Sequence, residues 1–129
     1  MKNILVVDDD QDIVELVRTR LEANNYQVTS ASTGREGLRK VQQIKPDLII
    51  MDIMMPEMEG GDAVRMLKAD LATRFIPIIF LTALTTQHPV DRESRGINVD
   101  DQFYPAIAKP FEPQKLLAEV RKLIGGGEG

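Results

Sequence analysis

Three short runs of consecutive apolar residues, at positions 4–7, 48–51 and 76–81, constrain the fold of this chain more than any other feature. None of them alternates apolar with polar residues. That pattern is typical of strands that are covered on both faces, as in a parallel sheet between two layers of helices. Two weaker runs, at 26–30 and 103–108, complete a set of five expected strands.

Helical patterns separate these runs. Asp10 or Asp12 can cap the first helix, Thr33 and Glu36 form a capping box at the second, and Pro113 suits the first turn of the last. The residues expected on the buried helical faces are Ile13, Leu16, Val17, Leu21, Leu38, Val41, Ile44, Ala63, Val64, Leu67, Leu71, Leu116, Leu117, Val120 and Ile124. The stretch 85–102 is polar and poorly patterned, and a short helix is expected there without defined ends.

Strands that alternate with helices predict a single α/β domain with right-handed crossovers and helices on both faces of the sheet. We expect this domain to span residues 1–124, followed by a glycine-rich tail at 125–129 that acts as a flexible linker or is a cloning scar. A chain of 129 residues is long enough to bury one core without cross-links.

Composition excludes several classes of function. The chain has no cysteine, which rules out disulfides, thiolate zinc sites and a thiol nucleophile. A formal net charge of -4 argues against nucleic-acid binding by this domain. The apolar runs are too short to span a membrane, and the first of them is followed at once by aspartates, unlike a signal peptide. We therefore expect a soluble protein of the cytoplasm.

Polar side chains follow the expected strands, where ligands bind in open parallel sheets. Asp8 and Asp9 follow the first strand, Asp52 the third, Thr82 the fourth and Lys109 the fifth. If the first and third strands are neighbours, the carboxylates converge and take up either protons or a cation. Oxygen ligands without cysteine or histidine favour a hard ion such as Mg²⁺. The lysine and the hydroxyl supply the positive charge and the donor that a phosphoryl group needs.

The segments around these residues resemble the receiver domains of two-component response regulators. The matching segments are 4–10, 48–56 with Gly60, 80–83 and 108–111, and the resemblance extends from residue 2 to 124. Each motif is weak by itself, but the four in this order are specific. The resemblance implies a flavodoxin-like, three-layer α/β/α fold in which five βα units form a five-stranded parallel sheet of order 2-1-3-4-5.

The resemblance also implies a phosphorylation switch. Asp52 would accept a phosphoryl group from the phosphohistidine of a sensor histidine kinase or phosphotransfer protein, and the domain would then change conformation to signal. Mg²⁺, or alternatively Mn²⁺, would be held by Asp8, Asp9, Asp52 and the backbone carbonyl of Met54. Lys109 and Thr82 would be the catalytic partners, and the phosphoryl oxygens would bind to Thr82, Ala83 and Lys109.

The sequence says less about how the phosphorylated state is regulated than about the phosphorylation site. Met54 and Leu84 occupy positions that tune hydrolysis of the phosphorylated form in similar proteins, and both are large and apolar. The family often has an aromatic switch residue three positions before the lysine, where this chain has Ala106. Either Tyr104 takes that role through a bulge at Pro105, or the switch is missing. Homodimers in this family form through the fourth helix, fifth strand and fifth helix, and the output domain or target is unknown.

Three alternatives remain open. The acidic cluster by itself is typical of a solvated helix N-terminus, with Asp10 as the cap. A Mg²⁺-dependent phosphohydrolase would use Asp8 as its nucleophile, although no cap domain is visible in the sequence. A pseudo-receiver would share the fold and serve only in protein interaction. The family reading instead predicts a signalling domain that takes part in its own phosphorylation and autodephosphorylation, and not an enzyme with a diffusible substrate.

Overall fold

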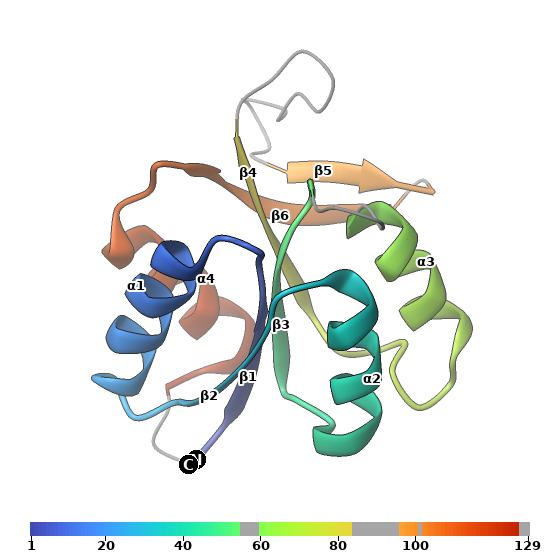
Figure 1. The fold of residues 1–129 in the computed structure, drawn as a ribbon, viewed down its shortest axis with the longest axis horizontal. Coiled ribbons are helices and arrows are strands. Elements are labelled where there is room, and N and C mark those ends of the chain that lie inside the picture. Colours follow the sequence, from blue (N-terminus) through green and yellow to red (C-terminus); the bar gives the residue numbers. More distant parts are fainter. Residues whose placement is uncertain (55–59, 84–95, 101, 127–129) are drawn as a thin grey trace.

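The structure is a computed structural model and describes residues 1–54, 60–83, 96–100 and 102–126 (Figure 1). In these residues a mixed sheet lies between two pairs of helices. The strands are β1 (Asn3–Val7), β2 (Gln27–Ala31), β3 (Leu48–Asp52), β4 (Ile78–Ala83), β5 (Gly96–Val99) and β6 (Gln102–Lys109). The helices are α1 (Gln11–Glu22), α2 (Gly34–Ile44), α3 (Gly60–Ala69) and α4 (Pro113–Ile124). No helix of the described segments has the length and apolar character needed to cross a membrane.

The sheet has the strand order β2-β1-β3-β4-β6-β5. Its first five strands are parallel to one another, which confirms the expected α/β fold and the order 2-1-3-4-5 when β6 is counted as the fifth strand. β1 and β3 are neighbours, with Val7 in register with Met51. The aspartates that follow β1 and end β3 are therefore placed side by side.

The prediction of a sheet limited to five strands was wrong, because β5 adds an antiparallel strand at the edge next to β6. Ile97 and Val99 of β5 are buried, whereas Asn98 between them is exposed, so this strand covers the sheet edge with an alternating pattern. The residues of β5 belong to the stretch 85–102, where a short helix was expected. Residues 84–95 of that stretch lie outside the described residues.

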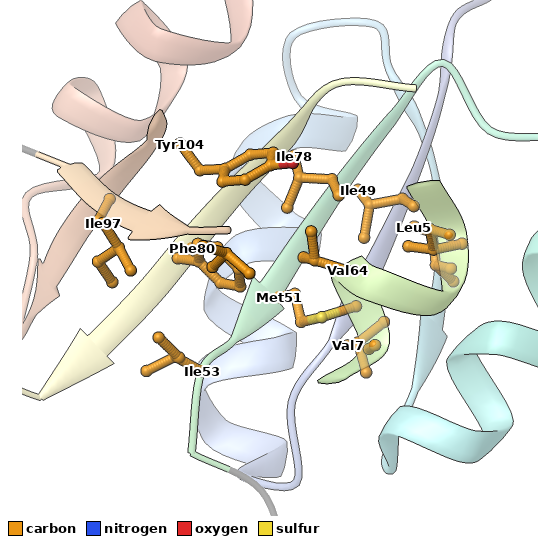
Figure 2. Packing of buried hydrophobic residues seen from close by; sticks show 14 of the residues in the cluster. Leu5, Val7, Ile49, Met51, Ile53, Val64, Ile78, Phe80, Ile97 and Tyr104 are labelled. Atoms are coloured by element: carbon orange, nitrogen blue, oxygen red, sulfur yellow. The ribbon is translucent and has the colours of Figure 1, made fainter. Parts of the chain in front are cut away.

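Helices α1 and α4 cover one face of the sheet, and α2 and α3 cover the other (Figure 1). Figure 2 shows the packing on the second face, where Val64 of α3 lies near Met51 and Phe80 of the central strands. The predicted caps are confirmed: Asp10 accepts hydrogen bonds from backbone N–H groups of the first turn of α1, and Thr33 does so for α2. Pro113 lies in the first turn of α4 as expected.

The buried helical faces were predicted with two errors. Leu16 of α1 is 38% exposed, because the buried stripe of this helix runs through Val14, Val17 and Leu21 instead. Leu71 is 76% exposed, because α3 ends at Ala69 and the chain leaves the helical path before that leucine.

Gly37 lies at a close contact between α2 and β1. A Cβ atom at this position would lie 2.8 Å from Cγ2 of Val7, a buried and stiff side chain. We expect Gly37→Ala to lower the free energy of unfolding by about 1–2 kcal/mol, since overpacking outweighs the helix propensity gained. Urea unfolding measures this change.

Gly61 in α3 is the matched control, because its Cβ would meet only a guanidinium nitrogen of Arg65 at 3.9 Å. Gly61→Ala should be neutral or stabilising by up to about 1 kcal/mol. Equal effects of the two substitutions would show that contact with Val7 does not limit the approach of α2.

Candidate functional site

The carboxyl ends of β1, β3, β4 and β6 bring the predicted site residues to one edge of the sheet. Asp8 directly follows β1, and Asp52 is the last residue of the adjacent β3. Thr82 lies in β4 in register with Ala108, one position before Lys109 in β6. Asp8, Asp52 and Thr82 are all buried, so their polar groups depend on one another and on nearby backbone for partners.

Lys109 bridges two of the carboxylates. Its Nζ donates to Oδ2 of Asp8 at 2.8 Å and to Oδ2 of Asp52 at 3.0 Å. The two bonds are similarly short, so the ammonium is shared between the two carboxylates. One carboxylate oxygen each from Asp8, Asp9 and Asp52 lie within 4.8 Å of one another, and only Asp9 of the three is exposed. The structure therefore forms an acidic cluster with an ammonium group bound to two of its three carboxylates.

Short backbone contacts orient the two buried carboxylates. The second oxygen of Asp8 accepts the N–H of Asp10 at 2.9 Å, and that of Asp52 accepts the N–H of Met54 at 3.0 Å. Each carboxylate therefore binds local backbone through Oδ1 and Lys109 through Oδ2. These contacts hold the Oδ2 atoms toward the centre of the site without any added ligand.

Burial raises the pKa of Asp8, and the negative charge of Asp52 acts in the same direction, while hydrogen bonds from Lys109 and from the backbone of Asp10 partly oppose both. For Lys109, burial is the largest single influence and lowers the pKa. Its hydrogen bonds to Asp8 and Asp52 together outweigh burial, so the pKa of Lys109 is raised. The ammonium is therefore held by hydrogen bonds to both buried carboxylates.

Comparison with known proteins identifies the family of this chain. The sequence model described as "Response regulator receiver domain" matches residues 4–121. The chain belongs to this family. It is therefore the receiver domain of a two-component response regulator, and its fold is the CheY-like, flavodoxin-like fold.

Relatives and solved structures agree with this assignment. The chain is 35% identical to the alkaline phosphatase synthesis transcriptional regulatory protein PhoP of Bacillus subtilis, over 98% of this chain and 50% of that protein. It is 39% identical to the response regulator SaeR of Staphylococcus epidermidis, over 96% of this chain and 51% of SaeR. The receiver domain thus spans about half of the length of these relatives.

Among solved structures, the chemotaxis protein CheY4 of Vibrio cholerae matches with a TM-score of 0.82 and 32% identity, covering 95% of this chain and 98% of CheY4. The receiver domain of the sensor histidine kinase PA1611 of Pseudomonas aeruginosa matches with a TM-score of 0.81 and 30% identity, covering 96% and 98% of the two chains. That structure contains a magnesium ion coordinated in its active site cleft.

The structure describes the other predicted site residues of the receiver domain only in part. Ala83 is in register with Lys109 at the end of β4. The side chain of Met54 is 40% exposed beside Asp52, while the suggested role of its carbonyl oxygen stays a prediction. Leu84 lies outside the described residues.

The position of the aromatic switch is filled by Ala106, which is in register with Phe80 of β4. Pairing continues without a bulge from this residue to Lys109. Tyr104 packs edge-to-face on Phe80 with the ring centroids 5.9 Å apart, on the core face of the sheet (Figure 2). Its hydroxyl donates to the side chain of Gln102 at 2.9 Å. Tyr104 is thus a packed core residue in this state of the receiver domain.

Proposed function

We propose that Asp52 accepts a phosphoryl group in a Mg²⁺-dependent reaction and that the receiver domain then changes conformation to signal. The observation that carries this proposal is the bridge from Lys109 to the two buried carboxylates of Asp8 and Asp52, beside the exposed Asp9. A cation already close to the acceptor carboxylate can neutralise the oxygens of an incoming phosphoryl group.

In the proposed reaction an oxygen of Asp52 attacks the phosphorus of a donor phosphohistidine. The new P–O bond forms as the P–N bond breaks, and the imidazole leaves with the bonding electrons. Lys109 pairs with the transferred oxygens, while Thr82 and the backbone of Ala83 donate hydrogen bonds to them. Asp52 suits the acceptor role better than Asp8, because the Asp8 side chain is fully buried and that of Asp52 keeps 9% exposure. This difference disfavours the phosphohydrolase alternative with Asp8 as nucleophile.

The three carboxylates fit a small divalent cation. Ligands of an octahedral Mg²⁺ ion lie about 3–4 Å apart, and the carboxylate oxygens within 4.8 Å of one another need to close only slightly on an ion. The donor set contains oxygen alone, which favours Mg²⁺ or Mn²⁺ over zinc or copper. We propose Asp8, Asp9, Asp52 and the carbonyl of Met54 as ligands. When bound, the ion would offset the negative charge of the phosphoryl oxygens.

Magnesium should stabilise the fold by mass action. At a concentration about 100 times its dissociation constant, Mg²⁺ should add about 2.7 kcal/mol to the free energy of unfolding. For a domain of this size that corresponds to a rise in Tm on the order of 10 °C, measured by thermal unfolding with and without chelator.

Asp9→Asn should lose most of this rise, because it removes the exposed carboxylate of the cluster. Asp12→Asn, a change at an exposed aspartate in the first turn of α1, should retain it. A rise of the same size in both variants would argue against metal binding at the cluster.

Mass spectrometry of the intact protein tests the proposed reaction directly. The chain is incubated with acetyl phosphate, with Mg²⁺ or with chelator, and its mass is then measured. We expect one phosphoryl adduct that forms only with Mg²⁺. Steady turnover of a phosphomonoester, abolished by Asp8→Asn, would instead support the hydrolase. No adduct under any condition would support the pseudo-receiver.

The proposed switch also includes autodephosphorylation, in which water attacks the phosphorylated Asp52. The Met54 side chain lies beside the acceptor and is large and apolar, so it should hinder the approach of water. We expect Met54→Asn to speed loss of the phosphoryl group several-fold, and more strongly when Leu84 is also replaced by a small polar residue. Decay of the intact-mass adduct after removal of donor gives the rate, and an unchanged rate would contradict this role.

The partner that supplies the phosphoryl group is proposed to be a sensor histidine kinase or a phosphotransfer protein, as the family implies. Because the curated relatives are about twice as long as this chain, we propose that the signal passes to an output domain or target protein. The dimer face expected from the family includes positions in 84–95, outside the described residues. The outer edge of β6, which belongs to that face, is paired with β5.

A further inference from the structure

A pocket lies away from the acidic site, between α3, the segment before β4 and the turn of the β5–β6 hairpin. Its volume is about 740 Å³, and its lining contains neither the aspartates nor the lysine of the first site. Sites for small molecules commonly measure about 300–1,000 Å³. The size of this pocket therefore suits a small organic ligand.

Among the described residues of the lining, the cations Arg65, Lys68 and Arg74 outnumber the one anion, Asp100. The guanidinium of Arg65 is already neutralised, since it bonds Asp100 at 3.0 Å and Asp62 at 2.9 Å. Within the described segments, no carboxylate lies within ion-pair distance of the side chains of Lys68 or Arg74. Two cations of the pocket are thus left for an anion from outside.

Lys68 is held in place without being neutralised. Its Nζ donates to the carbonyl oxygen of Arg74 at 2.5 Å and lies 5.6 Å from the centroid of the Tyr104 ring. Burial lowers the pKa of Lys68, and among the described residues no carboxylate raises it. A bound anion would supply the missing opposite charge and would raise this pKa again.

Apolar and aromatic groups form the rest of the lining. Val64 and Val99 are buried beneath the pocket, and the ring of Tyr104 forms part of its wall. Phe75 lines the pocket too, yet its side chain is 87% exposed and so contributes little to the core. A ring in this position is available to stack on a planar group of a ligand.

We propose that this pocket binds a small anion that carries a planar aromatic ring, the chemistry that a nucleotide presents. The anionic group would pair with Lys68 and Arg74, and the ring would pack against Phe75 and the apolar wall. The two requirements act together, so neither an uncharged ring nor a bare anion should bind as well.

Three probes separate these requirements: adenosine monophosphate, adenosine without the phosphate, and inorganic phosphate without the ring. Binding is measured by calorimetry and by amide chemical-shift changes, in chelator so that no metal joins phosphate to the acidic site. We expect adenosine monophosphate to bind at least tenfold more tightly than either other probe, with shift changes at Val64, Val99 and Tyr104. Equal affinities for the three probes, or shifts confined to Asp8 and Asp52, would overturn the proposal.

Variants test which residues of the pocket contribute to binding. Lys68→Met and Phe75→Ala should each weaken binding of adenosine monophosphate at least fivefold. Lys122→Gln and Leu71→Ala remove an exposed lysine and an exposed apolar side chain outside the lining, and both should leave the affinity unchanged. Binding that survives both pocket substitutions would overturn the proposal, as would an absence of binding by the wild-type chain. Because phosphorylation of Asp52 is measured separately, either proposal can fail alone.

Discussion

Asp52→Asn is expected to abolish the phosphoryl adduct, with a loss of at least about 100-fold in the amount formed, because an amide oxygen is a far poorer nucleophile than a carboxylate. The substitution keeps the shape of the side chain and its contact with the N–H of Met54. It also removes the charge that helps to raise the pKa of Asp8. The metal-free variant should therefore fold at least as stably as the wild type near neutral pH.

Asp47→Asn provides a control just before the opposite end of the same strand. Asp47 accepts a hydrogen bond from the backbone N–H of Asn3 and does not belong to the acidic cluster. This variant should form the adduct at the wild-type rate. Intact mass after exposure to acetyl phosphate and Mg²⁺ measures both variants, and a full adduct on the Asp52 variant would place the acceptor elsewhere.

Lys109→Met should produce the largest loss of stability. The lysine side chain is 18% exposed, and its partners Asp8 and Asp52 are 0% and 9% exposed, so this ion pair is largely shielded from water. Removing one partner of a buried pair leaves an uncompensated charge and costs about 3–5 kcal/mol. We expect a decrease of this size in the free energy of unfolding in chelator at neutral pH, measured with urea.

The deficit should depend on pH. Loss of Lys109 removes the side-chain hydrogen bond that lowers the pKa of Asp8, so this pKa rises further above its ordinary value of 3.8. An acid with a raised pKa in the folded state binds protons more tightly there than in the unfolded chain. The stability lost in the variant should be largest above the raised pKa, and it should shrink as the pH falls toward 3.8.

Lys115→Met is the matched control, because Lys115 is an exposed lysine of α4. It should change the free energy of unfolding by no more than about 0.5 kcal/mol. Saturating Mg²⁺ should restore more stability to the Lys109 variant than it adds to the wild type, because the cation takes over the lost positive charge. A loss below about 1 kcal/mol in chelator would show that the carboxylates do not depend on this lysine.

The sequence predicted the layers and the parallel strands because β1, β3 and β4 are short and continuously apolar, a pattern typical of strands covered on both faces. It also predicted which ends of these strands carry polar groups. Their convergence followed from the rule for parallel sheets, and the register of Val7 with Met51 confirms that β1 and β3 are neighbours. Local signals gave the caps at Asp10 and Thr33, since such contacts involve residues only two or three positions apart.

The features that the sequence did not predict depend on tertiary contacts that the sequence alone does not show. The apolar residues of β5, Ile97 and Val99, are buried, and their role is set by pairing with β6 and not by a local pattern. The second bond of Lys109, to Asp8, joins positions 101 residues apart. The pocket beside α3 likewise depends on Phe75 being left outside the core, although its apolar character alone would predict burial.

Hydrogen bonds join the end of α4 to the N-terminal part of the chain, at the end of the strands opposite the acidic cluster. The Tyr26 hydroxyl donates to the carbonyl oxygen of Gly125 at 2.6 Å, and Lys2 donates to that of Ile124. Lys2 directly precedes β1, whereas Asp8 follows its end. The five residues of β1 separate Lys2 from Asp8, and a strand of this length spans about 17 Å. A conformational signal from phosphorylated Asp52 would then have to cross the length of the domain to reach the end of α4.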